Sequence, residues 1–240
     1  MDAYSVELYK RFKIAPLVEA SSNKCSFIRR LAQGKLPVEN FDKWLFDDRL
    51  FVHAGAYHCA KIYVRAKQDP EINQGALTVL HTCYMALIPE LKRFDNMCKQ
   101  HGVKMPKLPP IEPTPEAMAQ TDPTQYYKLS SPKCRRYVQF ITKEVFDIPN
   151  LRTADLLYMV WLGEAIYHRS FATAAASPIF QKTYNKELEF VNYWGGRPFY
   201  KYVEELAYRC QELPSTELTH SLMIKVCEFE GLFWSSAEDD

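Results

Sequence analysis

The sequence predicts an all-α fold, and three observations support this prediction. Apolar residues recur every three or four positions over long stretches, which is the spacing of a helix packed on one side. No stretch keeps the strict alternation of a half-buried strand for long. Glycine is scarce, with eight residues in a chain of 240. Because no internal repeat or boundary interrupts the pattern, we expect residues 1–240 to form one helical domain built as a bundle.

The predicted helices are bounded by prolines, glycines and capping residues. They span residues 17–31, 37–67, 73–101, 126–145, 150–175, 178–193, 199–213 and 215–235. Gly102 is the expected C-terminal signal of the third helix, and Ser215 the expected N-cap of the last. Residues 104–123 hold six prolines, so this Pro-rich segment is predicted to be a loop.

The composition excludes some classes of protein. Lys plus Arg number 30 and Asp plus Glu 29, so the sequence has no electrostatic footprint for nucleic acid or for an acidic membrane surface. No apolar run approaches the roughly 20 residues of a membrane span, and the N-terminus lacks a signal-peptide profile. The seven cysteines are odd in number, widely spaced and without a Cys-x-x-Cys pair. We therefore expect a cytoplasmic protein with free thiols and no zinc site.

An acid stands on the apolar face of the helix predicted over residues 37–67. Helical spacing places Asp48 on one face with a set of mostly aromatic and apolar residues. These are Phe41, Trp44, Leu45, Phe51, Val52 and Gly55. A carboxylate there must be paired with another group, protonated, or used in binding or catalysis. Burying it unpaired would cost several kcal/mol of hydration free energy. Asp47 and Arg49 flank this face and are expected to lie laterally or in solvent.

Two later helices repeat the pattern with a glutamate. Glu164 shares its face with Leu157, Val160, Trp161, His168 and Phe171. Glu230 shares its face with Met223, Val226, Cys227, Phe233 and Trp234. A cavity in the bundle could bring all three acids together, where they would shift one another's pKa and divide acid and base roles. The alternative is structural, since a buried carboxylate is often paired with Arg, Tyr or a helix N-terminus.

The sequence gives less support to a metal site, a cysteine nucleophile or a phosphate-binding loop. Helical di-iron proteins use Glu-x-x-His pairs, but His168 stands four residues after Glu164, so no metal site is expected. No cysteine lies in a recognisable nucleophile motif, and each is expected to be a small core residue. The Gly195-Gly196 pair reads as a turn rather than a phosphate-binding loop.

Short motifs then occur in a recognisable order along the chain. They are Gly34–Pro37, Phe41, Trp44-Leu45, Asp48, Leu50–Val52, Glu90, Phe94, Tyr137, Phe140, Trp161–Tyr167, Ser170-Phe171, Trp194-Gly195, Phe199 and Glu228–Trp234. In this order they resemble the TenA/THI-4 family over nearly the whole chain. The resemblance implies a haem-oxygenase-like all-α fold without haem and a thiamin-related pyrimidine as the small-molecule substrate. It implies no cofactor, and it implies assembly into a homodimer or homotetramer.

The resemblance also implies roles for residues that bind the substrate. Asp48 matches the acid that holds the aminopyrimidine, and Tyr137 matches the tyrosine near the reactive centre. Phe51 and Trp194 fall where aromatic residues pack on the ring, and Trp161 is expected to wall the site with them.

Catalysis is assigned to the two glutamates. Glu230 matches the late glutamate that moves protons. The thiaminase II branch has a nucleophilic cysteine one turn before position 164, where this chain has Val160. Glu164 instead stands at the position of the glutamate in the TenA_E branch, so covalent cleavage by cysteine is not expected.

The expected activity is therefore hydrolysis of a C–N bond in aminomethyl or formylaminomethyl pyrimidine, releasing hydroxymethyl pyrimidine for thiamin salvage. Glu164 and Glu230 would share general base and acid work on water and the leaving amine. Two alternatives remain open: a non-catalytic pyrimidine-binding or scaffold protein of the same fold, and a di-metal oxidase.

Overall fold

The computed structural model describes residues 3–124 and 128–238, and these residues form helices and loops without a strand. The all-α prediction is confirmed. The chain divides into two compact units, one made of Met1–Asn40 with Ala154–Asp240 and the other of Phe41–Thr153. We call them the outer-sequence unit and the middle unit and treat each separately. A single domain over the whole chain stays a prediction.

The middle unit is built on two long helices. Its elements are α4 (Val38–Ala66), α5 (Gln74–His101), α6 (Pro115–Met118), α8 (Pro132–Thr142) and the 3₁₀ turn η1 (Glu144–Asp147). The helices predicted over residues 37–67 and 73–101 are therefore confirmed. Asn73 caps α5 by accepting a hydrogen bond from the Ala76 amide at 2.9 Å, and Gly102 ends it with φ 74°, as a left-handed C-cap requires.

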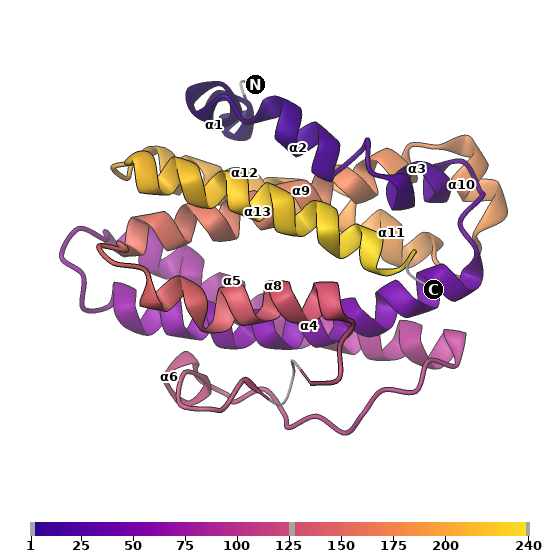
Figure 1. The fold of residues 1–240 in the computed structure, drawn as a ribbon, viewed down its shortest axis with the longest axis horizontal. Helices are drawn as coiled ribbons and strands as arrows, with labels where there is room; N and C mark the ends of the chain where they lie inside the picture. The colour runs from indigo at the N-terminus through magenta and orange to yellow at the C-terminus, as the bar shows by residue number, and fades with distance from the viewer. Residues whose placement is uncertain (1–2, 125–127, 239–240) are drawn as a thin grey trace. The chain divides into compact units, whose positions relative to one another are not determined.

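The long helices α4 and α5 run antiparallel (Figure 1). Asp42, near the start of α4, lies 2.6 Å from the ring nitrogen Nδ1 of His101 at the end of α5. Near the other end of the pair, the rings of Tyr63 and His81 have centroids 5.6 Å apart. Both helices present apolar side chains to their shared interface, which buries Trp44 and Phe94 completely.

The shorter helix α8 runs parallel to α4. The Ser131 amide, at the start of α8, donates to the Asp47 carboxylate at 2.9 Å, and further along the rings of Phe51 and Tyr137 stand 4.7 Å apart. The predicted helix start at residue 126 lies outside the described residues. Within them, α8 begins at Pro132 with Ser131 as its N-cap, a Ser-Pro pair that commonly opens a helix.

The Pro-rich segment is an extended loop interrupted only by the single turn α6, which confirms the predicted loop over residues 104–123. It is held against the two long helices. The Tyr84 hydroxyl of α5 donates to the Glu112 carbonyl at 2.5 Å, and Lys67 pairs with Glu116 at 2.7 Å.

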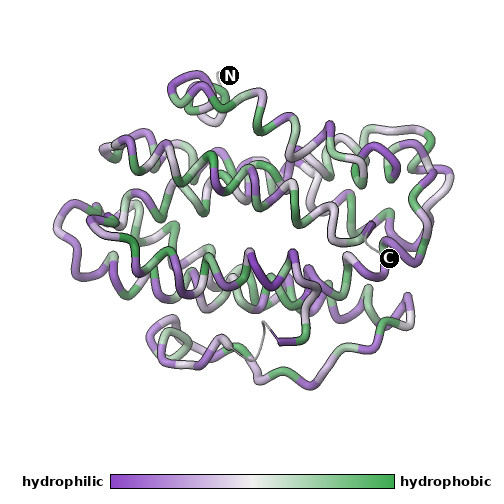
Figure 2. The backbone as a smooth tube through the Cα atoms, in the orientation of Figure 1, coloured by the Kyte–Doolittle hydropathy of each residue, from purple (hydrophilic) through white to green (hydrophobic). Residues whose placement is uncertain are grey.

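The outer-sequence unit contains the remaining helices. They are α1 (Tyr4–Phe12), α2 (Ala15–Ser21), α3 (Ser26–Ala32), α9 (Thr153–Ala175), α10 (Pro178–Thr183), α11 (Leu188–Trp194), α12 (Arg197–Gln211) and α13 (Glu217–Ser236). The last helix packs on α2 and α3, and α1 packs on α12. Apolar and polar positions are mixed along the helices (Figure 2), and no described helix has the length and apolar character to cross a membrane.

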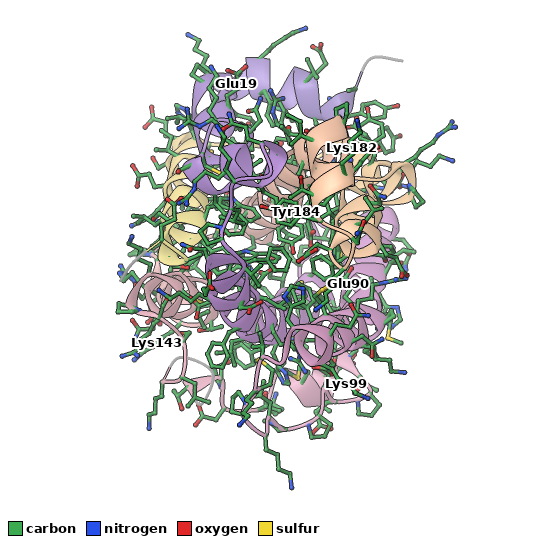
Figure 3. The ribbon with its side chains drawn as sticks, turned by 90° about the vertical axis from the view of Figure 1, so that its right-hand side faces the viewer. Glu19, Glu90, Lys99, Lys143, Lys182 and Tyr184 are labelled. Atoms are coloured by element: carbon green, nitrogen blue, oxygen red, sulfur yellow. The ribbon has the colours of Figure 1, made fainter. Side chains whose placement is uncertain are left out.

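Three predicted boundaries in this unit are wrong. The helix expected over residues 17–31 breaks at Ser22, whose hydroxyl bonds to the Val18 carbonyl and competes with the helical ladder. The helix expected over 178–193 breaks at Tyr184. The hydroxyl of this buried tyrosine, labelled in Figure 3, accepts a hydrogen bond from the Leu36 amide and donates one to the Leu36 carbonyl. The N-cap of α13 is Thr216, not Ser215.

Candidate functional site

Glu164 lies in the middle of α9, a helix of 23 residues. Its side chain keeps partial access to solvent, although Trp161, Leu162, Ala165 and Ile166 around it are buried. The surrounding protein disfavours the charged form and raises the pKa of the Glu164 carboxyl to about 7. A carboxyl group with such a pKa can take up or release a proton at neutral pH, as a general acid or base must.

Glu230 lies on α13 and is buried, with 5% of its surface exposed. The neighbouring residues show which face of α13 is buried. Phe229 and Phe233 are buried, whereas Glu228 is exposed. Glu230 therefore belongs to the inward face, as the helical spacing predicts.

The two glutamates lie at the same level of two neighbouring helices. The Thr219 hydroxyl near the start of α13 donates to Asp155 near the start of α9 at 2.5 Å, and further along the rings of Trp234 and Tyr167 stack 5.8 Å apart. These contacts make α9 and α13 parallel. Counted back from Tyr167 and Trp234, the axial positions of the two glutamates differ by about 1.5 Å, and counted forward from Asp155 and Thr219 they differ by about 3 Å.

The contacts between α9 and α13 also show how each glutamate is turned about its own helix axis. At 100° per residue, Glu230 falls within about 40° of both Thr219 and Trp234, the α13 residues that contact α9. Glu164 falls within about 20° of Phe171, whose ring contacts Trp234, but about 180° from Asp155, which bonds Thr219. That Glu164 and Glu230 meet in one site stays a prediction.

The two tryptophans predicted to wall the site are buried against protein. The Trp161 indole N–H donates to the Ser5 hydroxyl at 3.1 Å, and its ring lies 5.6 Å from the ring of Tyr9. Trp194 meets the rings of Tyr167 and Phe199 edge-on, at 5.4 and 5.0 Å. Both rings hold elements of this unit together, and their contact with a substrate stays a prediction.

The middle unit brings the other predicted residues together. Asp48 is 1% exposed, so its inward direction is confirmed. Tyr137 is buried with its ring against Phe51. One turn before Tyr137 lies Cys134, whose thiol pKa is raised well above its usual value, first by burial and then by the charges of Asp47 and Asp48. Asp48, Phe51, Cys134 and Tyr137 therefore form one cluster between α4 and α8.

Of the two placements expected for Asp47 and Arg49, solvent is wrong, and both side chains contact neighbouring helices. Asp47 is 3% exposed and accepts hydrogen bonds from the Ser131 amide and hydroxyl. Arg49 is 9% exposed and donates to Asp95 of α5 at 2.6 Å. Helical spacing finds the most apolar face, but α4 is covered by helices on several sides, so adjacent faces are buried too.

Sequence reasoning also missed the polar contacts that fix the helices around these clusters. Ser131 and Thr219 each stand at a helix start and bond a buried aspartate on another helix. The Ser-Pro pair at 131 could have indicated a helix start, but nothing in the sequence names the distant aspartate. Among the described residues, no group of three His, Cys, Asp or Glu side chains is placed to hold a metal ion.

The chain is 37% identical over 238 residues to the uncharacterized protein C530.07c of Schizosaccharomyces pombe, and the match covers 99% of this chain and 98% of that protein. Residues 14–127 match the model of the TENA/THI-4/PQQC family. The chain belongs to this family. Asp48 and Phe51 fall inside the matched residues, whereas Tyr137, Glu164 and Glu230 lie beyond them.

Solved structures related to TenA share the fold. A TenA homologue from Pyrococcus furiosus matches with a TM-score of 0.71 at 18% identity, covering 98% of this chain and 99% of that one. A putative TenA-like thiaminase from Sulfolobus solfataricus matches with a TM-score of 0.67 at 14% identity, covering 98% and 96%. Membership of the TenA_E branch, the roles of the site residues and the convergence of all three acids stay predictions.

Proposed function

We propose that this TenA-family chain is a thiamin-salvage hydrolase that cleaves a C–N bond of aminomethyl or formylaminomethyl pyrimidine and releases hydroxymethyl pyrimidine. Family membership supports the pyrimidine as substrate class, as does the name of the Sulfolobus solfataricus protein, a putative TenA-like thiaminase. The observation that carries the proposal is Glu164, a partly accessible carboxyl with a pKa of about 7 at the level of Glu230.

Glu164 is the general acid in this proposal. With a pKa of about 7 it is largely protonated below neutral pH, so it can donate a proton to the amine as the C–N bond breaks. Glu230 is the general base that takes a proton from the attacking water. The water oxygen bonds the methylene carbon as the bond from that carbon to nitrogen breaks. The leaving nitrogen takes the proton of Glu164 and departs as ammonia, or as formamide from the formyl derivative. The proton on Glu230 then passes to Glu164 for the next cycle.

Asp48 is the substrate anchor in this proposal. A carboxylate accepts hydrogen bonds from an exocyclic amino group and from a protonated ring nitrogen, which lie side by side on an aminopyrimidine. Phe51 offers an aromatic face with partial access to solvent, and Tyr137, packed on it at 4.7 Å, carries a hydroxyl for the exocyclic group.

The direct test is incubation of the purified chain with aminomethyl pyrimidine and with its formyl derivative, followed by chromatography of the pyrimidine products. We expect hydroxymethyl pyrimidine to accumulate. Glu164→Gln and Glu230→Gln should each lower turnover by about 10²-fold or more and retain binding of the product. Glu228→Gln is the matched control, because Glu228 is exposed on the same helix and should leave turnover unchanged.

Two results would contradict the proposal. A folded protein that binds hydroxymethyl pyrimidine without turning over either substrate would be a pyrimidine-binding protein of the same fold. Turnover that survives in both glutamine variants would remove Glu164 and Glu230 from the chemistry. Metal analysis of the purified protein separates the remaining alternative, a di-metal oxidase.

A further inference from the structure

Asp47 makes a two-point contact with the start of α8. Its carboxylate oxygen Oδ1 accepts a hydrogen bond from the Ser131 amide at 2.9 Å, and Oδ2 accepts one from the Ser131 hydroxyl. Asp47 is 3% exposed, so solvent competes little for these bonds. Hydrogen bonds to a charged acceptor in a buried setting are stronger than neutral ones.

The contact continues into the first turn of α8. The Ser131 hydroxyl oxygen accepts a hydrogen bond from the Cys134 amide at 3.3 Å, and this is the N-cap bond of α8. The Cys134 thiol in turn lies 3.6 Å from the Asp47 carbonyl oxygen. One residue of α4 thus contacts the amide, the hydroxyl and the thiol at the start of α8, which fixes both the level and the rotation of that helix.

The same helix carries a predicted substrate residue. Tyr137 lies six residues after Ser131, and Phe51 lies four after Asp47, so both rings are within two turns of the contact. Their 4.7 Å separation depends on how α8 is seated against α4. Asp48, the proposed anchor, is the residue next to Asp47.

We propose that Asp47 is a positioning residue for pyrimidine binding: by bonding the Ser131 amide and hydroxyl it holds α8 so that Tyr137 stands over Phe51 beside Asp48. This rests on the proposed function, in which Asp48, Phe51 and Tyr137 contact the substrate. The two-point contact is strongest with a carboxylate. An asparagine can keep both points only if its amide nitrogen donates to the Ser131 hydroxyl oxygen, which already accepts a hydrogen bond from the Cys134 amide, and it lacks the charge that strengthens both bonds.

The test is the affinity for hydroxymethyl pyrimidine, measured by calorimetry on the full chain. Asp47→Asn should weaken binding by about tenfold or more, and Ser131→Ala should weaken it less, because the Ser131 amide still donates. Ser131→Thr keeps the hydroxyl and should restore binding. The matched control is Asp42→Asn, since Asp42 lies on α4 but bonds His101 of α5. It should leave affinity unchanged even if it lowers stability.

Each variant must first be shown by circular dichroism to be fully folded at the temperature of the measurement, because reversible partial unfolding would itself weaken the apparent affinity. If Asp47 acts by positioning Tyr137, the effect of Asp47→Asn on affinity should require the Tyr137 side chain. In a Tyr137→Ala background, Asp47→Asn should weaken binding no further. Unchanged affinity in Asp47→Asn, or the same loss with and without Tyr137, would overturn the inference alone. Failure of the wild-type chain to bind any of the pyrimidines would overturn the proposed function, and the inference with it.

Discussion

Asp155 on α9 accepts a hydrogen bond from the Thr219 hydroxyl on α13 at 2.5 Å, and both side chains are fully buried. This contact joins the two helices that carry Glu164 and Glu230. It resembles the contact of Asp47 with Ser131 in the middle unit, where a buried aspartate also bonds a hydroxyl at the start of a parallel helix. In each unit, an aspartate on the first helix thus sets the register of the second.

Removing the Thr219 hydroxyl should destabilise the fold. Thr219→Val keeps the shape of the side chain but takes a donor from the buried Asp155 carboxylate, which costs about 1–3 kcal/mol. Urea unfolding measures the loss. Ser221→Ala is the control, because the Ser221 hydroxyl is exposed and bonds only within its own helix, to the Glu217 carbonyl. Equal midpoints for the two variants would show that the Asp155 contact contributes little.

The raised pKa of Glu164 predicts a pH dependence of stability. Burial raises it from 4.5 to about 7, so the folded chain binds this proton more tightly than the unfolded chain. The resulting stability is complete below pH 4.5 and is lost as pH rises to about 7, by at most about 3 kcal/mol. Glu164→Gln should remove this loss in urea unfolding between pH 5 and 8. An unchanged pH slope in the variant would contradict the raised pKa.

His58 predicts the opposite trend in acid. Burial lowers its pKa from 6.5 to about 4, so the folded chain holds it neutral while the unfolded chain protonates it. The stability is present above pH 6.5 and is lost as pH falls towards 4, by at most about 3 kcal/mol. His58→Gln should flatten this part of the curve. A pH dependence of stability that His58→Gln leaves unchanged would contradict the lowered pKa.

Gly195 lets the turn between α11 and α12 approach the backbone of α9. A Cβ atom there would stand 2.7 Å from the Phe171 carbonyl oxygen and the Ala172 amide nitrogen, closer than real Cβ contacts. Gly195→Ala should therefore lower stability by more than about 2 kcal/mol. Gly55→Ala is the matched control, because apart from the adjacent residues and the backbone of α4 itself no described atom lies within 4 Å of its Cβ position. It should stabilise α4 by about 0.5–1 kcal/mol, and thermal unfolding should rank the two variants accordingly.

The sequence predicted the long helices well because their signals are local. Asn73 and Gly102 mark the ends of α5 through bonds to residues three or four positions away. The shorter helices were predicted less well. The break at Tyr184 depends on Leu36, which is distant in sequence and bonds the Tyr184 hydroxyl. No local pattern contains that information.

In the candidate site too, local patterns predicted some features, whereas others depend on residues far apart in the sequence. Helical spacing alone placed Asp48 and Glu230 inward, and both are buried. It could not predict that Asp47 is buried as well, because that depends on Ser131 of a helix far along the chain. Nor could it predict that Glu164 and Glu230 stand at one level, since the register of two parallel helices is set by contacts such as that of Asp155 with Thr219.

In the proposed reaction, Glu164 supplies the proton that the leaving amine requires. The most direct measurement is kcat for aminomethyl pyrimidine in wild type and Glu164→Gln, from about pH 5.5 to 8.5, with product affinity measured in parallel. We predict wild-type turnover that falls as pH rises through about 7, where Glu164 loses its proton, and a loss of about 10²-fold or more in the variant with affinity retained. Equal turnover in the two proteins across this range would contradict the claim.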